Sequence, residues 1–546
     1  MTDTPTLSTD VLVVGGGPVG LCTSMFLARQ GVSTVLVEKH NEMSSIARAN
    51  GLHARTMELF REYGLEPRIS EMGTEMTTPG STDDKEAVSS GEASPMRMVG
   101  AKTLADLTPH SILEAHTVQT ELTPSRPRWC GQNHYQSLVL DTARDFGVRD
   151  HFGTELVQVE QDEEGVTAHL RNRRTRQDST LRARYLIAAD GVHSPVREQV
   201  GIGGPTLHGT LDLFSVDFFC DEELIPGTPG FTWARVFHPH AHGLLTRIGP
   251  DRWVFGLTYY PERGQSPQDF TDQHCIDLVR TATGRTDLDI EIESALPWQA
   301  THFVADQYRH GRVFLAGDAG HTHPPAGGFG VNLGIQDAHN LAWKLAMVLQ
   351  GQAGPGLLDS YESERRPVGQ ATADQAWMLF NRRSEPATEE ERAEFRDVQT
   401  VANGYRYHSQ AVIGAGSRRE VVPRSTVFNG RPGTRAPHAW LHTGQGRISS
   451  LDLFGSGFTL IAGAKAEEWV IAAKEAADAL GLPLATYRLG SDVTDPDHTW
   501  VRDSGINETG ALLVRPDGFV AWRATEITTS PATELTNALT HILTLD

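Results

Sequence analysis

The first residues able to do chemistry are three glycines near the N-terminus. Gly15, Gly17 and Gly20 have the spacing Gly-x-Gly-x-x-Gly and lie between an apolar, β-branched run and a helix-forming run. The first glycine permits a tight turn, the second lets backbone N–H groups meet a pyrophosphate, and the third lets helix pack on strand. Glu38 ends the next strand-like run, where its carboxylate can accept a hydrogen bond from a ribose hydroxyl. In this context the motif predicts a dinucleotide-binding site rather than a turn that only packs.

A second stretch of the chain is rich in glycine and proline, as is typical of a loop whose backbone lies close to a bound group. The stretch 311–345 contains seven glycines and two prolines, and Asp318 follows a strand-like run within it. Pro324 and Pro325 fix φ, and a helix beginning near Asn332 would point its positive N-terminal end at the bound group. A packing turn seldom needs Asp, Pro-Pro and Gly-Gly together. We therefore expect this stretch to form part of a binding site.

A third motif follows another apolar strand-like run. Asp190 and Gly191 end that run, and Ser194 and Arg197 stand at the start of a helix-like segment. Taken alone, Asp-Gly is a common turn dipeptide. A dehydrogenase that binds only a nicotinamide cofactor needs the first glycine motif but not the other two, so the two further motifs favour a different cofactor.

Histidines and aromatic residues gather in the strand-like region 207–298. Alternation along one strand would place His238, His240 and His242 on one face, where three imidazoles can bind a metal. No carboxylate evidently completes such a site, so contacts with a polar ligand or surface positions are the alternatives. The aromatic residues are Trp233, Phe237, Tyr259, Tyr260 and Trp298. They can stack on a flat aromatic ligand, although core packing suits most of them.

Together these motifs resemble those of the class A flavoprotein monooxygenases, the para-hydroxybenzoate hydroxylase-like family of FAD-dependent aromatic monooxygenases, and within it the aromatic polyketide hydroxylases. The resemblance extends from about residue 10 to residue 368, with a looser match in the C-terminal unit. The three motifs match that family's three FAD motifs, and the Asp190-Gly191 motif is linked there to NAD(P)H use. Gly320 stands where the family usually has alanine.

The resemblance implies a set of cofactor-binding residues. Arg48 matches an arginine that reaches the phosphates of FAD, although it would also suit a helix surface, and Gln132 matches a glutamine that contacts the flavin. Asp318 would bind the ribityl hydroxyls, and the helix N-terminus after the glycine-rich loop would stabilise the negative charge of a reduced flavin. The full set is Gly15, Gly17, Pro18, Gly20, Glu38, Lys39, Arg48, Gln132, Asp190, Gly191, Gly317, Asp318, Pro325, Gly328, Gly330, Val331 and Asn332.

The resemblance also implies the reaction. NADPH or NADH would reduce FAD, O2 would add to the flavin C4a, and the hydroperoxide would deliver one oxygen to a polycyclic phenolic or quinoid polyketide in secondary-metabolite biosynthesis. This chemistry needs no metal, and a dry pocket would protect the hydroperoxide. No catalytic base can be assigned from the sequence. The pocket candidates are His238, His240, Tyr259, Trp298 and Pro325.

Two other functions stay open at this point. A Baeyer–Villiger or ring-rearranging oxygenase would use the same fold, and the sequence does not separate it from a hydroxylase. A non-catalytic flavin-bound scaffold or carrier would keep the FAD motifs but would not oxidise NAD(P)H in response to a substrate. A flavin halogenase is disfavoured because the sequence contains no Trp-x-Trp-x-Ile-Pro segment.

The predicted fold class is α/β, with a Rossmann-like FAD-binding domain, an inserted antiparallel β-sheet substrate domain and a C-terminal thioredoxin-like domain. The C-terminal unit has a strand, helix and hairpin pattern but no cysteine, so we expect a structural or dimerisation role rather than redox chemistry. The expected domains are 1–68, 128–200 and 300–384 for FAD binding, 69–127 and 201–299 for substrate binding, 385–421 as a helical linker, and 422–546 as the thioredoxin-like domain.

Composition limits the class of protein and its partners. The chain has 546 residues and a net charge of -21 without a basic stripe, which argues against nucleic acid or anionic membrane as a partner. Its four cysteines lie far apart, which is typical of a reducing compartment. The N-terminus lacks the pattern of a signal peptide, and no apolar run approaches membrane-spanning length. We therefore expect a cytoplasmic monomer or homodimer that binds a small aromatic polyketide and O2.

Overall fold

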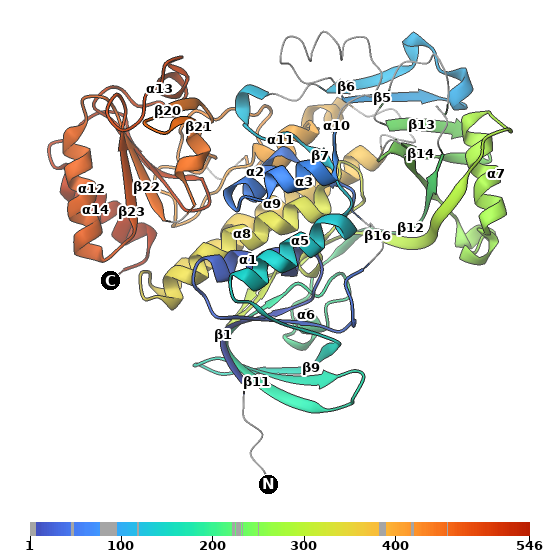
Figure 1. Cartoon of the computed structure of the whole chain (residues 1–546), viewed down its shortest axis with the longest axis horizontal. Helices are drawn as coiled ribbons and strands as arrows, with labels where there is room; N and C mark the ends of the chain where they lie inside the picture. The colour runs from blue at the N-terminus through green and yellow to red at the C-terminus, as the bar shows by residue number, and fades with distance from the viewer. Residues whose placement is uncertain are drawn as a thin grey trace.

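The computed structural model describes residues 7–44, 49–76, 96–116, 120–220, 224, 231, 233–248, 251–381, 389–416, 420–455 and 457–545. Within these ranges the chain forms a central α/β body, a second sheet on one side of it and a smaller α/β unit on the other (Figure 1). No helix in the described ranges is long and apolar enough to cross a membrane.

The central sheet brings the three glycine motifs to one edge. Its strand order is β17-β18-β11-β1-β2-β8, and its neighbours are parallel except for β17 and β18. Val14 at the end of β1 is paired with both Ala188 and Val37, and Ala188 is paired with Leu315. Because the carboxyl ends of parallel strands share an edge, the residues after them converge. The strands are β1 (Leu7–Val14), β2 (Thr34–Glu38), β8 (Arg149–Phe152), β11 (Asp178–Ala188), β17 (Arg309–His310) and β18 (Val313–Leu315).

A hairpin extends this sheet from β11. It consists of β9 (Thr154–Gln161) and β10 (Val166–Asn172), and β10 is antiparallel to β11. The backbone N–H groups of Glu164 and Gly165 both donate to the Asp162 carboxylate at 2.9 Å. These two hydrogen bonds close the hairpin turn at Glu164 and Gly165.

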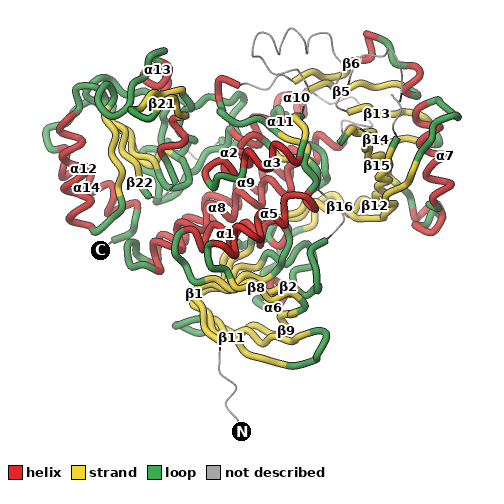
Figure 2. The backbone as a smooth tube through the Cα atoms, viewed as in Figure 1, coloured by secondary structure: helices red, strands yellow, loops and turns green. Residues whose placement is uncertain are grey.

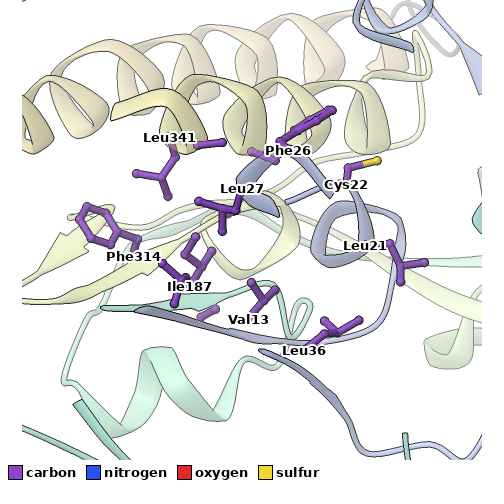
Figure 3. Packing of buried hydrophobic residues seen from close by; sticks show 14 of the residues in the cluster. Val13, Leu21, Cys22, Phe26, Leu27, Leu36, Ile187, Phe314 and Leu341 are labelled. Atoms are coloured by element: carbon purple, nitrogen blue, oxygen red, sulfur yellow. The ribbon is translucent and has the colours of Figure 1, made fainter. Parts of the chain in front are cut away.

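Helices pack on the central sheet through a fully buried apolar layer. Val13 and Ile187 from neighbouring strands lie close to Leu27 of α1, and Leu341 of α8 closes the layer (Figure 3). Burying each such side chain stabilises the fold by about 1.5–3 kcal/mol. The helices of this body are α1 (Pro18–Arg29), α2 (Ala54–Glu62), α3 (Glu66–Met72), α5 (Gln132–Asp145), α6 (Pro195–Gln199), α8 (Phe329–Leu349) and α9 (Asp359–Asn381).

The second sheet is the antiparallel layer expected from the alternating pattern. Its order is β19-β16-β12-β15-β14-β13-β5-β6, and all neighbours are antiparallel except β13 and β5. Helix α7 (Asp272–Thr283) packs against it. The strands are β5 (Met96–Ala101), β6 (Ile112–His116), β12 (Thr206–Phe219), β13 (Trp233–His238), β14 (Ala241–Arg247), β15 (Arg252–Thr258), β16 (Glu291–Val304) and β19 (His321–Thr322).

Strand β16 runs through the boundary expected at residues 299 and 300. Its last residues, Phe303 and Val304, pair with β19, which belongs to the glycine-rich stretch of the first domain. The two sheets are therefore joined beside that stretch. The domain boundaries themselves stay a prediction.

The C-terminal unit has the strand order of a thioredoxin-like domain. Its order is β23-β22-β24-β25, with β22 parallel to β23 and antiparallel to β24. Helices α12 and α14 lie side by side against this sheet (Figure 2). The strands and helices are β20 (Trp440–Thr443), β21 (Gly446–Ser449), β22 (Phe458–Ala462), α12 (Glu467–Leu480), β23 (Leu484–Arg488), α13 (Thr499–Ser504), β24 (Ala511–Val514), β25 (Val520–Ala524) and α14 (Pro531–Ile542). The three architectural parts of the predicted fold, a mainly parallel α/β sheet, an antiparallel sheet and a thioredoxin-like C-terminal unit, are all present.

Shorter elements connect these units. In the expected linker, α10 (Glu389–Glu394) and α11 (Val398–Asn403) are helical, and most of the other described residues there are irregular. A small three-stranded sheet has the order β3 (Gly51–Leu52), β7 (Arg128–Trp129) and β4 (Thr74–Glu75).

Candidate functional site

A cavity of about 1850 Å³ is lined by both large sheets and by residues preceding the C-terminal unit. All three glycine-containing motifs contribute to its wall. A single small-molecule pocket usually has about 300–1000 Å³. The cavity therefore has room for a dinucleotide cofactor and a second ligand.

The first glycine motif shapes the cavity at the start of α1. Gly15 has φ +111°, and a Cβ atom there would lie 2.2 Å from the Ala189 carbonyl oxygen. A Cβ at Gly20 would lie 1.8 Å from the Gly15 carbonyl oxygen, so Gly20 permits packing and is not among the cavity-lining residues. Gly17 caps α1 without a side-chain hydrogen bond. The N–H groups of the first turn are therefore available to an anionic ligand.

Glu38 is held at the cavity wall by backbone donors. Its Oε2 accepts a hydrogen bond from the Gly16 N–H at 2.6 Å, and its Oε1 accepts from the His40 N–H at 2.8 Å. A Cβ at Gly16 would lie 2.9 Å from the Glu38 Cβ, so this contact requires glycine. Gly16 was missed by the sequence reasoning, which took only the spaced glycines of the motif. Lys39 also lines the cavity.

The Asp190-Gly191 motif presents a buried carboxylate to the cavity. Asp190 Oδ2 accepts a hydrogen bond from the Val196 N–H at 3.1 Å, whereas Oδ1 is buried without a protein partner. Burial raises the pKa of Asp190 above its ordinary value. Arg197 donates to the Ala319 carbonyl at 2.8 Å and thereby ties this motif to the third one. A ligand that donates to Asp190 would satisfy the unpartnered oxygen.

The third motif is a tight turn fixed by a buried ionic network. Gly317 has φ +61° and donates its N–H to Asp337 at 3.1 Å. Asp337 also accepts from His321 and from Arg365, each at 2.7 Å. Burial opposes the charged form of Asp337, but Arg365 and His321 hold its pKa below the ordinary value. Asp318, next in the chain, keeps its side chain exposed on the cavity wall.

Helix α8 begins earlier than the sequence suggested. It starts at Phe329 because Gly328, with φ +65°, caps it, so the expectation of a start near Asn332 was wrong. The side chain of Asn332 is buried inside the first turns, where it accepts from the His53 N–H at 2.8 Å and donates to the Gly328 carbonyl at 2.8 Å. Asn332 therefore anchors the loop rather than lining the cavity.

His53 was missed by the sequence analysis and lines the cavity beside this loop. Its Nε2 lies 2.9 Å from the Gly327 carbonyl oxygen. Burial lowers the pKa of His53 to about 4, so the imidazole is neutral at neutral pH. No spacing signal marks His53, because its partners lie more than 270 residues away in the chain.

The other expected cofactor residues divide into three groups. Arg48 lies outside the described residues. Gly317 shapes the turn but is not among the cavity-lining residues. Those on the cavity wall are Gly15, Gly17, Pro18, Glu38, Lys39, Gln132, Asp190, Gly191, Asp318, Pro325, Gly328, Gly330 and Val331.

The histidine expectation needs correction. His238 ends β13 and Ala241 begins β14, so a hairpin turn separates the histidines and strand alternation does not apply across it. Among the described residues His242 lines the cavity, whereas His238 and His240 do not. In the described part of the chain, no group of three His, Cys, Asp or Glu residues is arranged to hold a metal ion.

Aromatic residues line the part of the cavity formed by the second sheet. Tyr259 and Trp298 are on its wall, as the sequence suggested, together with Trp233 and Tyr260, and the expected Pro325 lines the cavity from the glycine-rich loop. The indole N–H of Trp298 donates to the Ser215 hydroxyl at 2.9 Å, which fixes the ring. This wall can hold a flat aromatic ligand.

Residues leading into the C-terminal unit also reach the cavity, which sequence reasoning did not anticipate. Phe428 and Arg435 line it, and the Arg435 guanidinium lies 4.1 Å from the centre of the Phe428 ring. Arg435 also pairs with Glu58 of α2, a fully buried ion pair. Arg435 therefore both joins α2 to the segment before β20 and contributes to the cavity wall.

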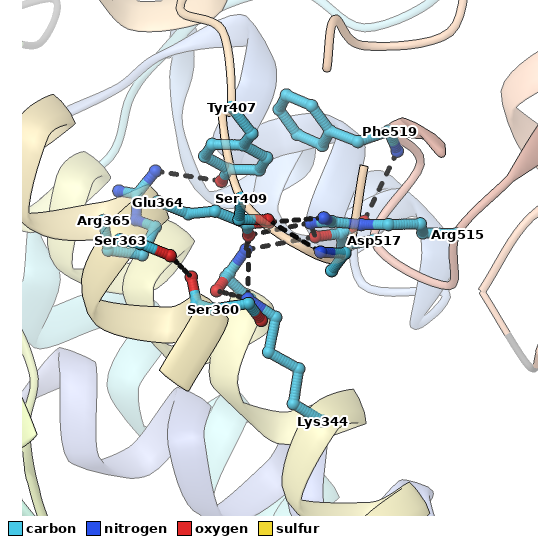
Figure 4. A network of polar contacts seen from close by, with 12 residues as sticks. Lys344, Ser360, Ser363, Glu364, Arg365, Tyr407, Ser409, Arg515, Asp517 and Phe519 are labelled. Carbon is cyan, nitrogen blue, oxygen red and sulfur yellow. Dashed lines mark hydrogen bonds and ion pairs between the residues drawn. The ribbon is translucent and has the colours of Figure 1, made fainter. Parts of the chain in front are cut away.

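A second buried ionic network joins α8 and α9 to the C-terminal unit (Figure 4). Glu364 accepts from Arg515 at 2.5 and 2.9 Å, from Lys344 at 2.7 Å and from the Ser409 hydroxyl at 2.6 Å. Arg515 also pairs with Asp517. Burial lowers the pKa of Lys344 to about 8, and Glu364 opposes that shift. The network fixes the C-terminal unit against the helix that begins at the glycine-rich loop.

Comparison with known families divides the chain in the same way as the fold. Residues 8–376 match the FAD binding domain family, and residues 429–544 match the aromatic-ring hydroxylase C-terminal family.

Similar proteins match over nearly the full length. The tetracenomycin A2 monooxygenase-dioxygenase of Streptomyces glaucescens is 44% identical, covering 98% of this chain and 96% of that protein. The aklavinone 12-hydroxylase of Streptomyces purpurascens is 37% identical, covering 98% of both. The crystal structure of aklavinone-11 hydroxylase with FAD and aklavinone superposes with a TM-score of 0.86 at 35% identity, covering all of both chains.

Proposed function

Because this chain belongs to the FAD-binding aromatic-ring hydroxylase family, a family of flavin monooxygenases, we propose that it inserts one oxygen atom from O2 into a polycyclic aromatic polyketide of antibiotic biosynthesis. NADPH or NADH is the proposed reductant. The observation that carries the substrate proposal is the wide cavity, whose lining combines the cofactor motifs with aromatic residues of the second sheet. Relatives named for tetracenomycin and aklavinone substrates support it.

The residues of this chain fit FAD. The uncapped N-terminus of α1 and the glycines before it suit a pyrophosphate. Glu38 suits a ribose, and the unpartnered Oδ1 of Asp190 suits a donor group of the cofactor. When bound, FAD would accept two electrons from NAD(P)H and would then activate O2.

The protein contributes electrostatics and positioning to this chemistry. The N-terminus of α8, the positive end of the helix dipole, follows the Pro325–Gly328 loop directly. The dipole therefore favours a negatively charged ligand group beside this loop. His53 beside that loop is neutral, so the helix rather than an imidazolium supplies the positive field. The Asp337–Arg365 pair holds the adjoining turn in place. Trp298, fixed by Ser215, orients a flat ring against the same region.

A ring-inserting or ring-rearranging oxygenation is the second candidate. Two relatives are named monooxygenase-dioxygenases, which supports oxygen transfer beyond a single hydroxylation in this group of proteins but does not by itself favour ring insertion. The cavity suits either reaction, because both need the same flat substrate beside the same cofactor. Product mass and ring connectivity separate the two.

The test is a steady-state assay on purified protein loaded with FAD. NADPH or NADH oxidation and O2 uptake would be followed with tetracenomycin A2 and aklavinone, and products identified by mass. Substrate-stimulated oxidation with a product heavier by one oxygen supports the proposal. FAD binding with no stimulated oxidation by any polycyclic phenol supports a scaffold instead, and failure to bind FAD overturns the whole proposal.

A further inference from the structure

The cavity face of the second sheet changes from apolar to polar along its length. On β12, every second residue from Leu211 lines the cavity, and each has a cavity-lining partner on β16. The successive pairs are Leu211 with Ala300, Leu213 with Trp298, Ser215 with Leu296, and Asp217 with Ser294. The polar pair is therefore the last of the series.

This polar end is remote from the glycine-rich loop. The other end of β16, at Phe303 and Val304, pairs with β19 directly before that loop. Six residues separate Leu211 from Asp217, which corresponds to roughly 20 Å along a strand. A long flat ligand with one end at the loop would thus extend toward Asp217.

Asp217 is a buried carboxylate without a dedicated cation. Only 6% of it is exposed, and its Oδ2 lies 4.0 Å from the Arg252 guanidinium. That guanidinium lies 2.5 Å from Glu293 and is therefore engaged mainly there. Burial raises the pKa of Asp217 to about 6, so at pH 7.5 it is mostly ionised. A buried carboxylate gains from a ligand that donates a hydrogen bond to it.

We propose that Asp217 is a substrate-positioning residue that accepts a hydrogen bond from a ring hydroxyl at the end of the polycyclic substrate farthest from the glycine-rich loop. This inference rests on the proposed function. By fixing the remote ring, Asp217 determines which carbon of the near ring lies beside the flavin. It acts on affinity and on the position of oxygenation rather than on the chemical step.

The test measures binding and product position for Asp217→Asn. Removing the charged acceptor should raise the Kd of aklavinone or tetracenomycin A2 for the FAD-loaded protein about tenfold or more. It should also raise KM more than it lowers kcat and broaden the mixture of oxygenated positions. Arg252 keeps its partner Glu293 in this variant, so the sheet should still fold.

Asp212→Asn is the matched control. Asp212 is on the same strand but is not among the cavity-lining residues, and it accepts from the Gln299 side chain at 2.8 Å. The control should bind substrate as the wild type does. Equal effects of the two substitutions, or unchanged binding and product position in Asp217→Asn, would overturn the inference while leaving the proposed function intact.

Substrate variants give a readout that needs no mutant. Methylating the hydroxyl that contacts Asp217 should weaken wild-type binding about tenfold, and the same methyl ether should cost little in Asp217→Asn. If every mono-O-methyl ether binds the wild type as tightly as the parent compound, the inference is wrong. If neither parent compound binds the FAD-loaded protein, the proposed function fails and the inference fails with it.

Discussion

Replacing Gly20 by alanine should weaken FAD binding without touching a ligand atom. The added Cβ would lie 1.8 Å from the Gly15 carbonyl oxygen and 3.0 Å from the Gly15 carbonyl carbon, and both are backbone atoms. Helix α1 must therefore move away from β1, at a cost of about 1–3 kcal/mol in the free energy of unfolding. The same movement displaces the first-turn N–H groups. Losing one hydrogen bond to a charged phosphate raises the Kd for FAD at least about tenfold.

The assay is a fluorescence titration of apoprotein with FAD, with thermal unfolding followed in parallel. Gly444→Ala is the control, because a Cβ at Gly444 meets no atom within 4 Å. It should match the wild type in both measurements. A folded Gly20→Ala protein that binds FAD as tightly as the wild type would refute the packing role of this glycine and the place of the cofactor beside it.

Two further predictions concern buried titratable groups. Glu364→Gln removes the buried carboxylate that pairs with Lys344 and leaves Arg515 with Asp517 alone, so the free energy of unfolding should fall by about 3–5 kcal/mol in a urea titration. Lys465→Met removes an exposed ion pair with Glu508 and should lower the free energy of unfolding by less than about 1 kcal/mol. Equal losses in the two variants would contradict the claim that burial makes the Glu364 network more important for stability. The pKa of His53 is about 4 in the folded protein against an ordinary value of 6.5, so the unfolded state takes up the proton first as pH falls. The free energy of unfolding should therefore decrease as the pH falls from 6.5 to 4, and His53 should account for a loss of about 2 kcal/mol at pH 5. In His53→Gln the free energy of unfolding, measured across this range, should depend less steeply on pH.

The local parts of the site could be predicted from the sequence. The glycines of the first motif, Asp190-Gly191 and Asp318 follow strands of one parallel sheet, so short-range patterns were enough to place them together. Tyr259 and Trp298 were also correctly expected in the pocket. These features depend on residues within one strand, turn or helix.

Features that depend on distant pairing could not be predicted. The histidine error is a different case, because the turn between His238 and Ala241 contains Pro239, a local turn signal that the alternation argument overlooked. Asp217 reaches the cavity because of its register with Ser294, and Arg435 because it pairs with Glu58, 377 residues away in the chain. Such contacts are fixed by tertiary packing, which single-sequence patterns do not report.

The most direct test of the account is a single-turnover reaction of the FAD-loaded protein with NADPH, a polycyclic polyketide phenol and ¹⁸O2, followed by mass spectrometry of the product. A flavin monooxygenase should give a product that carries one ¹⁸O atom from O2 on an aromatic ring, formed only when both reductant and substrate are present. A product with oxygen from water, or NADPH consumption that yields only hydrogen peroxide with every substrate tried, would contradict it.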